Sequence, residues 1–124
     1  MSAKNTEGNN VLPFIRPAKH GSATSAATAE LRELLRVYDH LIALLRETYD
    51  EGLDRLADNI VASVVACREA MASGLDDKTG PELVKKMRQG LHEMPQTLRS
   101  LLPGIGPRLG ESMERKLGIQ FSRY

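Results

Sequence analysis

A long series of apolar residues at helical spacing is the feature of this sequence that most constrains its fold. Between residues 27 and 73, large apolar side chains recur three and four positions apart and keep their phase, so they share one face of an α-helix. Aromatic residues make up only 4% of the chain, which disfavours sheets. We therefore expect an all-α protein. The main residues of this face, here called the seam, are Leu31, Leu35, Tyr38, Ile42, Leu45, Leu56, Ile60 and Val64.

One glycine, Gly52, interrupts the seam. A lone glycine costs a helix about 1 kcal/mol, which weakens the helix without ending it. The spacing therefore predicts one long helix, straight or kinked, over about residues 27–73, with Gly74 following its C-terminal end. The alternative is two helices joined at Gly52, which agrees better with the usual length of helices.

The one-helix interpretation has a consequence for oligomerisation. A helix over residues 27–73 cannot bury its apolar face along its whole length against the short remainder of the chain. The face would then pair with the same face of a second copy, as in a coiled coil. The sequence thus predicts a homodimer with the seam at its interface.

Proline and glycine divide the second half of the chain into two further helices. Apolar residues at helical spacing follow Pro81 and predict a helix over about residues 81–101, interrupted near Pro95. A last helix is expected over about 107–118, starting at Pro107. Together with the seam these helices predict a single helical domain over residues 26–124.

The first 25 residues have a different composition. Residues 1–25 are rich in Asn, Gly, Ser, Ala and Thr and lack a sustained apolar period, which predicts a flexible tail. Val11 to Pro17 form an apolar island held extended by two prolines. Such an island either docks on a protein partner as a linear motif or folds back on the helical core, and the sequence leaves both interpretations open.

Charge is segregated along the chain although the net charge is only +1. Residues 26–77 hold five Lys and Arg against eleven Asp and Glu, a net charge of −6, whereas residues 83–124 hold eight against three, a net charge of +5. A basic C-terminal third suits an anionic partner such as nucleic acid. The alternative is that it packs against the acidic middle of its own chain or of a second copy.

One short motif stands in the basic third. Leu-Pro-Gly-Ile-Gly-Pro, residues 102–107, falls between two expected helices and predicts a tight turn. Glycines let backbone N–H groups approach an oxygen anion closely, and the following helix directs the positive end of its dipole to the same point. A purely structural connection between two helices is the alternative.

Residues 97–119 resemble the helix-hairpin-helix motif of DNA-binding proteins and repair enzymes, which grips a phosphate of the DNA backbone without reading bases. The resemblance implies a hairpin of Gly104, Ile105 and Gly106, with the amides of both glycines as phosphate donors and Ile105 packed inward between the helices. Arg108, Arg115 and Lys116 are assigned as flanking cations by their charge alone. The family usually carries alanine at the position of Gly110, and its motif tends to work in pairs, for which a dimer would supply the second copy.

Convergent catalytic or metal-binding groups are not apparent in the sequence. The three histidines lie in separate segments, no His or Cys pair has metal-ligand spacing, and no phosphate loop or dinucleotide motif is present. The single cysteine, Cys67, lies on the apolar face and is expected to be a buried hydrophobic residue. We therefore expect no enzyme activity, no metal and no cofactor. The chain shows no signal peptide or membrane span, so a cytoplasmic protein without a membrane role is expected.

These observations lead to one function and one alternative. The first is a non-catalytic accessory protein that binds DNA without sequence specificity, as a dimer through the seam. The alternative is a helical adaptor or assembly protein that binds a protein partner and has no nucleic-acid role.

Overall fold

Helices account for nearly all of the described part of the chain. The computed structural model describes the backbone of residues 18–124 and the side chains of residues 25–124. No strand occurs among these residues, which confirms the all-α class. The elements are α1 (Ala18–Glu47), α2 (Glu51–Ser73), α3 (Thr79–His92), α4 (Met94–Leu101), α5 (Gly106–Leu117) and the 3₁₀ turn η1 (Phe121–Arg123).

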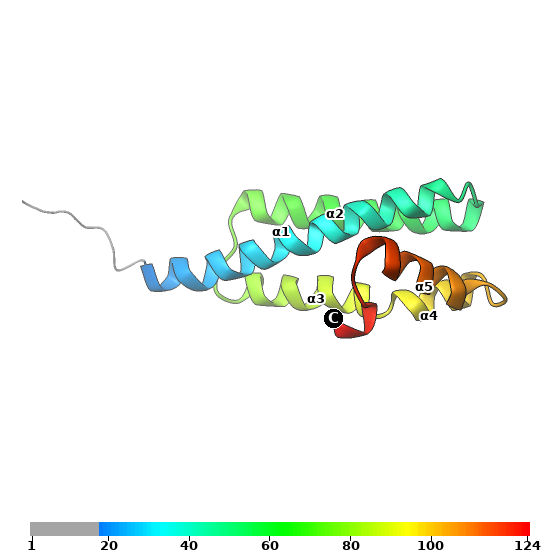
Figure 1. Ribbon diagram of the computed structural model, residues 1–124. Coiled ribbons are helices and arrows are strands. Elements are labelled where there is room, and N and C mark those ends of the chain that lie inside the picture. The colour runs from blue at the N-terminus through cyan, green and yellow to red at the C-terminus, as the bar shows by residue number, and fades with distance from the viewer. Residues whose placement is uncertain (1–17) are drawn as a thin grey trace, which may run out of the picture.

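The seam is folded back on itself. α1 ends at Glu47, α2 begins at Glu51, and the two helices lie antiparallel and side by side (Figure 1). The prediction of one continuous helix over 27–73 is therefore wrong, and the two-helix alternative is correct in kind. The break lies at residues 48–50, however, and Gly52 falls in the first turn of α2. At the other ends, α1 begins at Ala18, earlier than expected, and α2 is followed by Gly74 as predicted.

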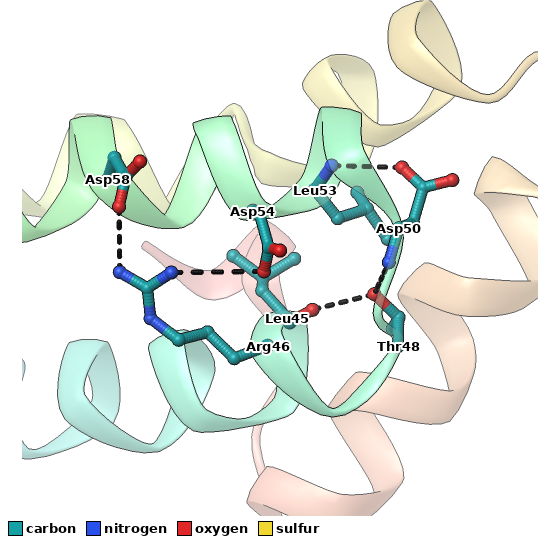
Figure 2. Close-up of polar contacts among 7 residues, drawn as sticks. All are labelled: Leu45, Arg46, Thr48, Asp50, Leu53, Asp54 and Asp58. Atoms are coloured by element: carbon teal, nitrogen blue, oxygen red, sulfur yellow. Dashed lines mark hydrogen bonds and ion pairs between the residues drawn. The ribbon is translucent and has the colours of Figure 1, made fainter.

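Hydrogen bonds of Thr48 and Asp50 end α1 and start α2 (Figure 2). The Thr48 hydroxyl donates to the Leu45 carbonyl oxygen at 2.7 Å and accepts the Asp50 N–H at 3.2 Å. The Asp50 carboxylate in turn accepts the Leu53 N–H at 3.0 Å, which is the usual cap at a helix N-terminus. Tyr49, between them, has a positive φ of 55°, so the chain reverses direction here.

An arginine holds the two helices together beside this turn. Arg46 on α1 lies between two carboxylates of α2, with Asp58 at 2.8 Å and Asp54 at 3.8 Å (Figure 2). These groups are exposed enough that the pairing adds little stability of its own. Its effect is to favour the antiparallel register of α1 and α2.

The seam residues form the core of the chain itself. Six of the eight are buried, and Ile42 and Leu56 are partly buried against the same core. Because α1 and α2 cover one another's apolar faces and α1 also packs against α3 and α5, the seam has no free face left for a second copy. The seam therefore gives no reason to expect a homodimer. Cys67 is fully buried, as predicted.

The C-terminal helices agree closely with the expected boundaries. α3 and α4 are separated at Glu93, directly before Met94 and Pro95, where the interruption was predicted. α4 and α5 pack against each other, and η1 returns to α3 (Figure 1). The return is held by Phe121, whose side chain is fully buried and whose N–H donates to the Glu114 carboxylate at 2.7 Å.

Two sequence predictions fall on residues that the structure does not describe. The apolar island Val11 to Pro17 and the predicted tail up to residue 17 lie outside the described residues. Within residues 18–124, no helix combines the length and the apolarity that crossing a membrane would require.

Candidate nucleic-acid interface

The helices α4 and α5 are joined by a tight turn over residues 102–105. The Leu102 N–H closes the last turn of α4 on the Leu98 carbonyl oxygen at 2.8 Å. The Leu102 carbonyl oxygen then accepts two N–H groups, from Ile105 at 3.2 Å and from Gly106 at 2.5 Å. The two helices and their hairpin thus form where the sequence placed them, at one end of the molecule (Figure 1).

Gly106 serves the packing of the two helices. It is buried, and a Cβ at this position would lie 2.5 Å from the carbonyl oxygen of Leu98 and 2.7 Å from its carbonyl carbon. No side chain fits there without moving the α4 backbone. Because the Gly106 N–H is already bonded to Leu102, the expectation that it would donate to a phosphate is corrected: this donor is engaged within the chain.

Gly104 lies on the other side of the same turn and is exposed. A Cβ at this position would meet nothing within 4 Å. Within residues 18–124, the N–H groups of Gly104 and of Arg108 have no hydrogen-bond acceptor. Arg108 stands in the first turn of α5, where backbone N–H groups are left without helical partners. The free amide donors of the hairpin are therefore Gly104 and Arg108.

Ile105 does not take the inward position that the motif implies. Its side chain is 55% exposed, and Leu101 at the end of α4 is 44% exposed. The expectation that Ile105 locks the two helices together is therefore wrong. Instead, the helices touch through the close approach of Gly106 to Leu98, and the hairpin carries an apolar tip of Leu101 and Ile105.

Exposed cations lie along α4 and α5. Arg99, in the last turn of α4, and Arg108, in the first turn of α5, stand beside the hairpin, whereas Arg115 and Lys116 lie in the last turn of α5, at its far end, and do not flank the hairpin as predicted. The predicted Arg108, Arg115 and Lys116 are all exposed, and so is Arg99 on α4, which the sequence interpretation did not include. None of these four forms an ion pair with a carboxylate in the described part of the chain. Their charges are thus available to a partner.

The basic third and the acidic middle are joined by little charge pairing. Among the described side chains, the ion pair that links them is Arg88 to Glu30 at 2.6 Å. Other pairs lie within the acidic middle, such as Arg68 with Asp39 at 2.9 Å. In the described part of the chain, ion pairing between the two regions thus involves Arg88 of α3 and leaves the cations of α4 and α5 without carboxylate partners.

No catalytic constellation accompanies the hairpin in the described part of the chain. His40 lies on α1 and His92 at the end of α3, on separate elements. Burial raises the pKa of the Cys67 thiol, which disfavours the reactive thiolate. Among the described residues, no three metal-ligating side chains come together.

Comparison with known proteins identifies no relative of this chain. No family model, no curated protein and no solved structure matches the chain. The functional interpretation therefore depends on the geometry and charge of the hairpin.

Proposed function

We propose that the α4–α5 hairpin binds the phosphate backbone of DNA without reading its sequence. The observation that carries this proposal is the exposed turn in which the N–H groups of Gly104 and Arg108 have no acceptor in the described part of the chain. The N-terminal end of α5 directs its positive dipole to the same place, which favours an oxygen anion.

The exposed cations of α4 and α5 supply the second part of the interaction, with Arg99 and Arg108 beside the turn and Arg115 and Lys116 further along α5. Arg99, Arg108, Arg115 and Lys116 are exposed and lack carboxylate partners among the described side chains. Each can neutralise a phosphate and release a counterion from the DNA. With only a few such contacts, binding is expected to be weak and to fall steeply with salt. Sequence specificity is not expected, because amides and phosphate contacts carry no base information.

A single hairpin per chain limits the affinity. A second hairpin would come from a second copy, as the sequence interpretation expected. The seam is used within the chain, so two copies would have to meet through another surface. The proposal accordingly requires that the hairpin binds DNA and does not require a dimer. Sedimentation of the protein with and without DNA would measure whether two copies associate.

Fluorescence anisotropy with a labelled random-sequence duplex tests the proposal. We expect the intact chain to bind at about 50 mM salt and to lose most of its affinity at about 200 mM. Gly104→Pro removes the free N–H, whereas Gly104→Ala keeps it, and a Cβ at position 104 would meet nothing within 4 Å. The proline variant should therefore bind more weakly than the alanine variant, and Arg108→Gln should weaken binding and reduce its salt dependence.

The matched control is Arg55→Gln, which removes an exposed arginine from α2, where it lies 3.8 Å from Glu51. This variant should bind DNA like the intact chain. Circular dichroism of each variant verifies that the helices are retained. Absence of binding at low salt, or equal affinities of the intact chain and Arg108→Gln, would reject the proposal.

The exposed apolar tip favours a second candidate, a protein-binding role. Leu101 and Ile105 offer an apolar contact surface that phosphate binding does not require. In this case the hairpin would insert its tip into a partner, and Ile105→Ser would abolish the interaction while Arg108→Gln changed it little. Indifference to DNA at low salt, together with unchanged helix content, would favour this candidate over the first.

A further inference from the structure

A groove between α1 and α2 carries an unusual concentration of arginine. It has a volume of about 420 Å³, within the range of sites that hold small molecules. The groove exists because α1 and α2 fold back on each other, so side chains distant in sequence come to face one space. Its lining residues are Arg32, Leu35, Arg36 and Asp39 from α1 and Arg68 and Met71 from α2.

The groove is a positive island in the acidic part of the chain. Residues 26–77 contain five arginines and no lysine, against eleven carboxylates, and three of those arginines line this groove. With Asp39 as the one carboxylate of the lining, the groove has a net charge of +2. The remaining two arginines pair with carboxylates near the α1–α2 turn.

The internal pairing leaves this charge incompletely compensated. Asp39 contacts Arg68 at 2.9 Å, and Glu33, outside the lining, contacts Arg36 at 3.5 Å with both side chains largely exposed. Arg32 forms no ion pair among the described side chains. A bound anion would therefore meet one free guanidinium and two that are held by single contacts.

The arrangement also works against the stability of the helix. Arg32 and Arg36 are four residues apart on α1, a spacing at which like charges repel, and Arg68 faces them from α2. All three side chains are exposed, so burial of their stems does little to offset this repulsion. An oxyanion between the three groups would turn the repulsion into attraction.

We infer that this groove binds the phosphate group of a small molecule. A guanidinium offers paired N–H donors that match two oxygens of a phosphate, and a dianion balances the net charge of the groove. Leu35 and the half-buried Met71 supply an apolar wall for the part of the molecule that carries the phosphate. A long polyanion fits poorly, because it would leave the island and run along acidic helices. The site is separate from the hairpin and does not depend on the proposed DNA binding.

Pyrophosphate is the probe for this inference. Calorimetric titration of the full chain at low ionic strength measures its affinity, and the ¹⁵N-labelled arginine Nε signals report where it binds. We expect the Nε signals of Arg32, Arg36 and Arg68 to shift together along one saturable curve. Arg32→Gln and Arg36→Gln should each weaken binding at least about threefold. Asp39→Asn should tighten it, because Arg68 is then released to the ligand.

Two controls separate this site from other cations. Arg55→Gln removes an arginine of α2 outside the groove, and Arg108→Gln removes the principal cation of the hairpin, so neither should change the affinity. Inorganic sulfate at equal ionic strength shows whether a simple anion suffices. The inference is overturned if the Arg32→Gln, Arg36→Gln double variant binds pyrophosphate as well as the intact chain does. Shifts confined to Arg99, Arg108 and Arg115 would also overturn it.

Discussion

The hydroxyl of Tyr38 on α1 donates a hydrogen bond of 2.6 Å to the carbonyl oxygen of Met87 on α3, and this bond ties the two helices together inside the core. Burial raises the pKa of Tyr38 to about 12, so the hydroxyl remains a donor throughout the neutral range. Gly90 lies one turn further along α3, and a Cβ at this position would overlap the hydroxyl oxygen of Tyr38. The Tyr38 hydroxyl thus depends on the Met87 carbonyl oxygen as its acceptor and on the absence of a side chain at Gly90 for its space.

This relationship predicts that the effect of Gly90→Ala reverses sign with the residue at position 38. In the intact chain the new Cβ would overlap the Tyr38 hydroxyl, so we expect a loss of about 1–3 kcal/mol in the free energy of unfolding. In a Tyr38→Phe background the nearest atom would be Cζ at 3.6 Å, an ordinary contact, and alanine should stabilise α3 by up to about 1 kcal/mol. Urea unfolding of the four variants measures both effects. Equal destabilisation in both backgrounds would contradict this account.

The turn between α1 and α2 offers a stabilising substitution. Tyr49 has a φ of 55° and a side chain that is 91% exposed, so its backbone is strained and its ring contributes no buried contact. Asparagine adopts this conformation readily, and Tyr49→Asn should raise the free energy of unfolding by about 0.5–1 kcal/mol. Tyr49→Val, with a branched Cβ, should lower it. Thermal unfolding of the two variants beside the intact chain measures the difference, and an order with valine above asparagine would refute the assignment of strain.

Two glycines of α5 should respond oppositely to alanine. At Gly106 the Cβ would lie 2.5 Å from the Leu98 carbonyl oxygen, so Gly106→Ala should destabilise the fold by about 1–3 kcal/mol. At Gly110 the nearest atom is the Leu98 Cδ1 at 3.7 Å, which leaves room for a methyl group. Gly110→Ala should therefore stabilise the helix by about 1 kcal/mol. Chemical unfolding measures the free energy of unfolding of both variants. A similar loss of stability in Gly106→Ala and Gly110→Ala would mean that α4 lies equally close to the two positions.

The connection between α2 and α3 has a pH-dependent contribution to stability. The Asp76 carboxylate accepts hydrogen bonds from the N–H and hydroxyl of Thr79 and from the N–H of Lys78, which lowers the pKa of Asp76 below its ordinary value of 3.8. A carboxyl whose folded pKa is lowered contributes its stability fully above the unfolded pKa and loses it as the pH falls through the folded value.

Asp76→Asn should accordingly be less stable than the intact chain at neutral pH, and the difference should shrink as the pH falls below 3.8. Unfolding measured from neutral pH to about pH 2 follows this difference. The control is Glu69→Gln, an exposed carboxylate of α2 that forms no ion pair with the described side chains. A difference that grows toward acid would mean that folding raises the pKa of Asp76 instead of lowering it.

The helical class and the later helix boundaries could be predicted because their causes are local. Pro81 and Pro95 mark starts of helices by removing an N–H that no helical turn needs, and Gly74 closes α2 with a positive φ of 97°. The break at residues 48–50 also has a local signal, which is Asp50 as a cap with Glu51 and Asp54 after it. Gly52 is the more conspicuous residue in this stretch, but its effect on a helix is small and it does not cause the break.

The candidate sites could be predicted only in part, because they depend on contacts of the folded chain. The motif located the turn at Gly104, but the backbone of the turn itself engages the Gly106 N–H with the Leu102 carbonyl oxygen, which the motif does not reveal. The arginine groove brings together residues as distant as Arg32 and Arg68, which a continuous helix would have kept apart. The first difference arises from the hydrogen bonding of the turn and the second from the reversal of the chain between α1 and α2.

The α1–α2 turn and the α4–α5 hairpin share one end of the molecule (Figure 1), and the turn carries the carboxylates of Glu47, Asp50 and Glu51. A polyanion seated on the hairpin would therefore have these carboxylates as a repelling neighbour along one flank. Its trajectory would be restricted to the side facing away from α1 and α2, so the fold would orient a bound strand even though it cannot distinguish one sequence from another.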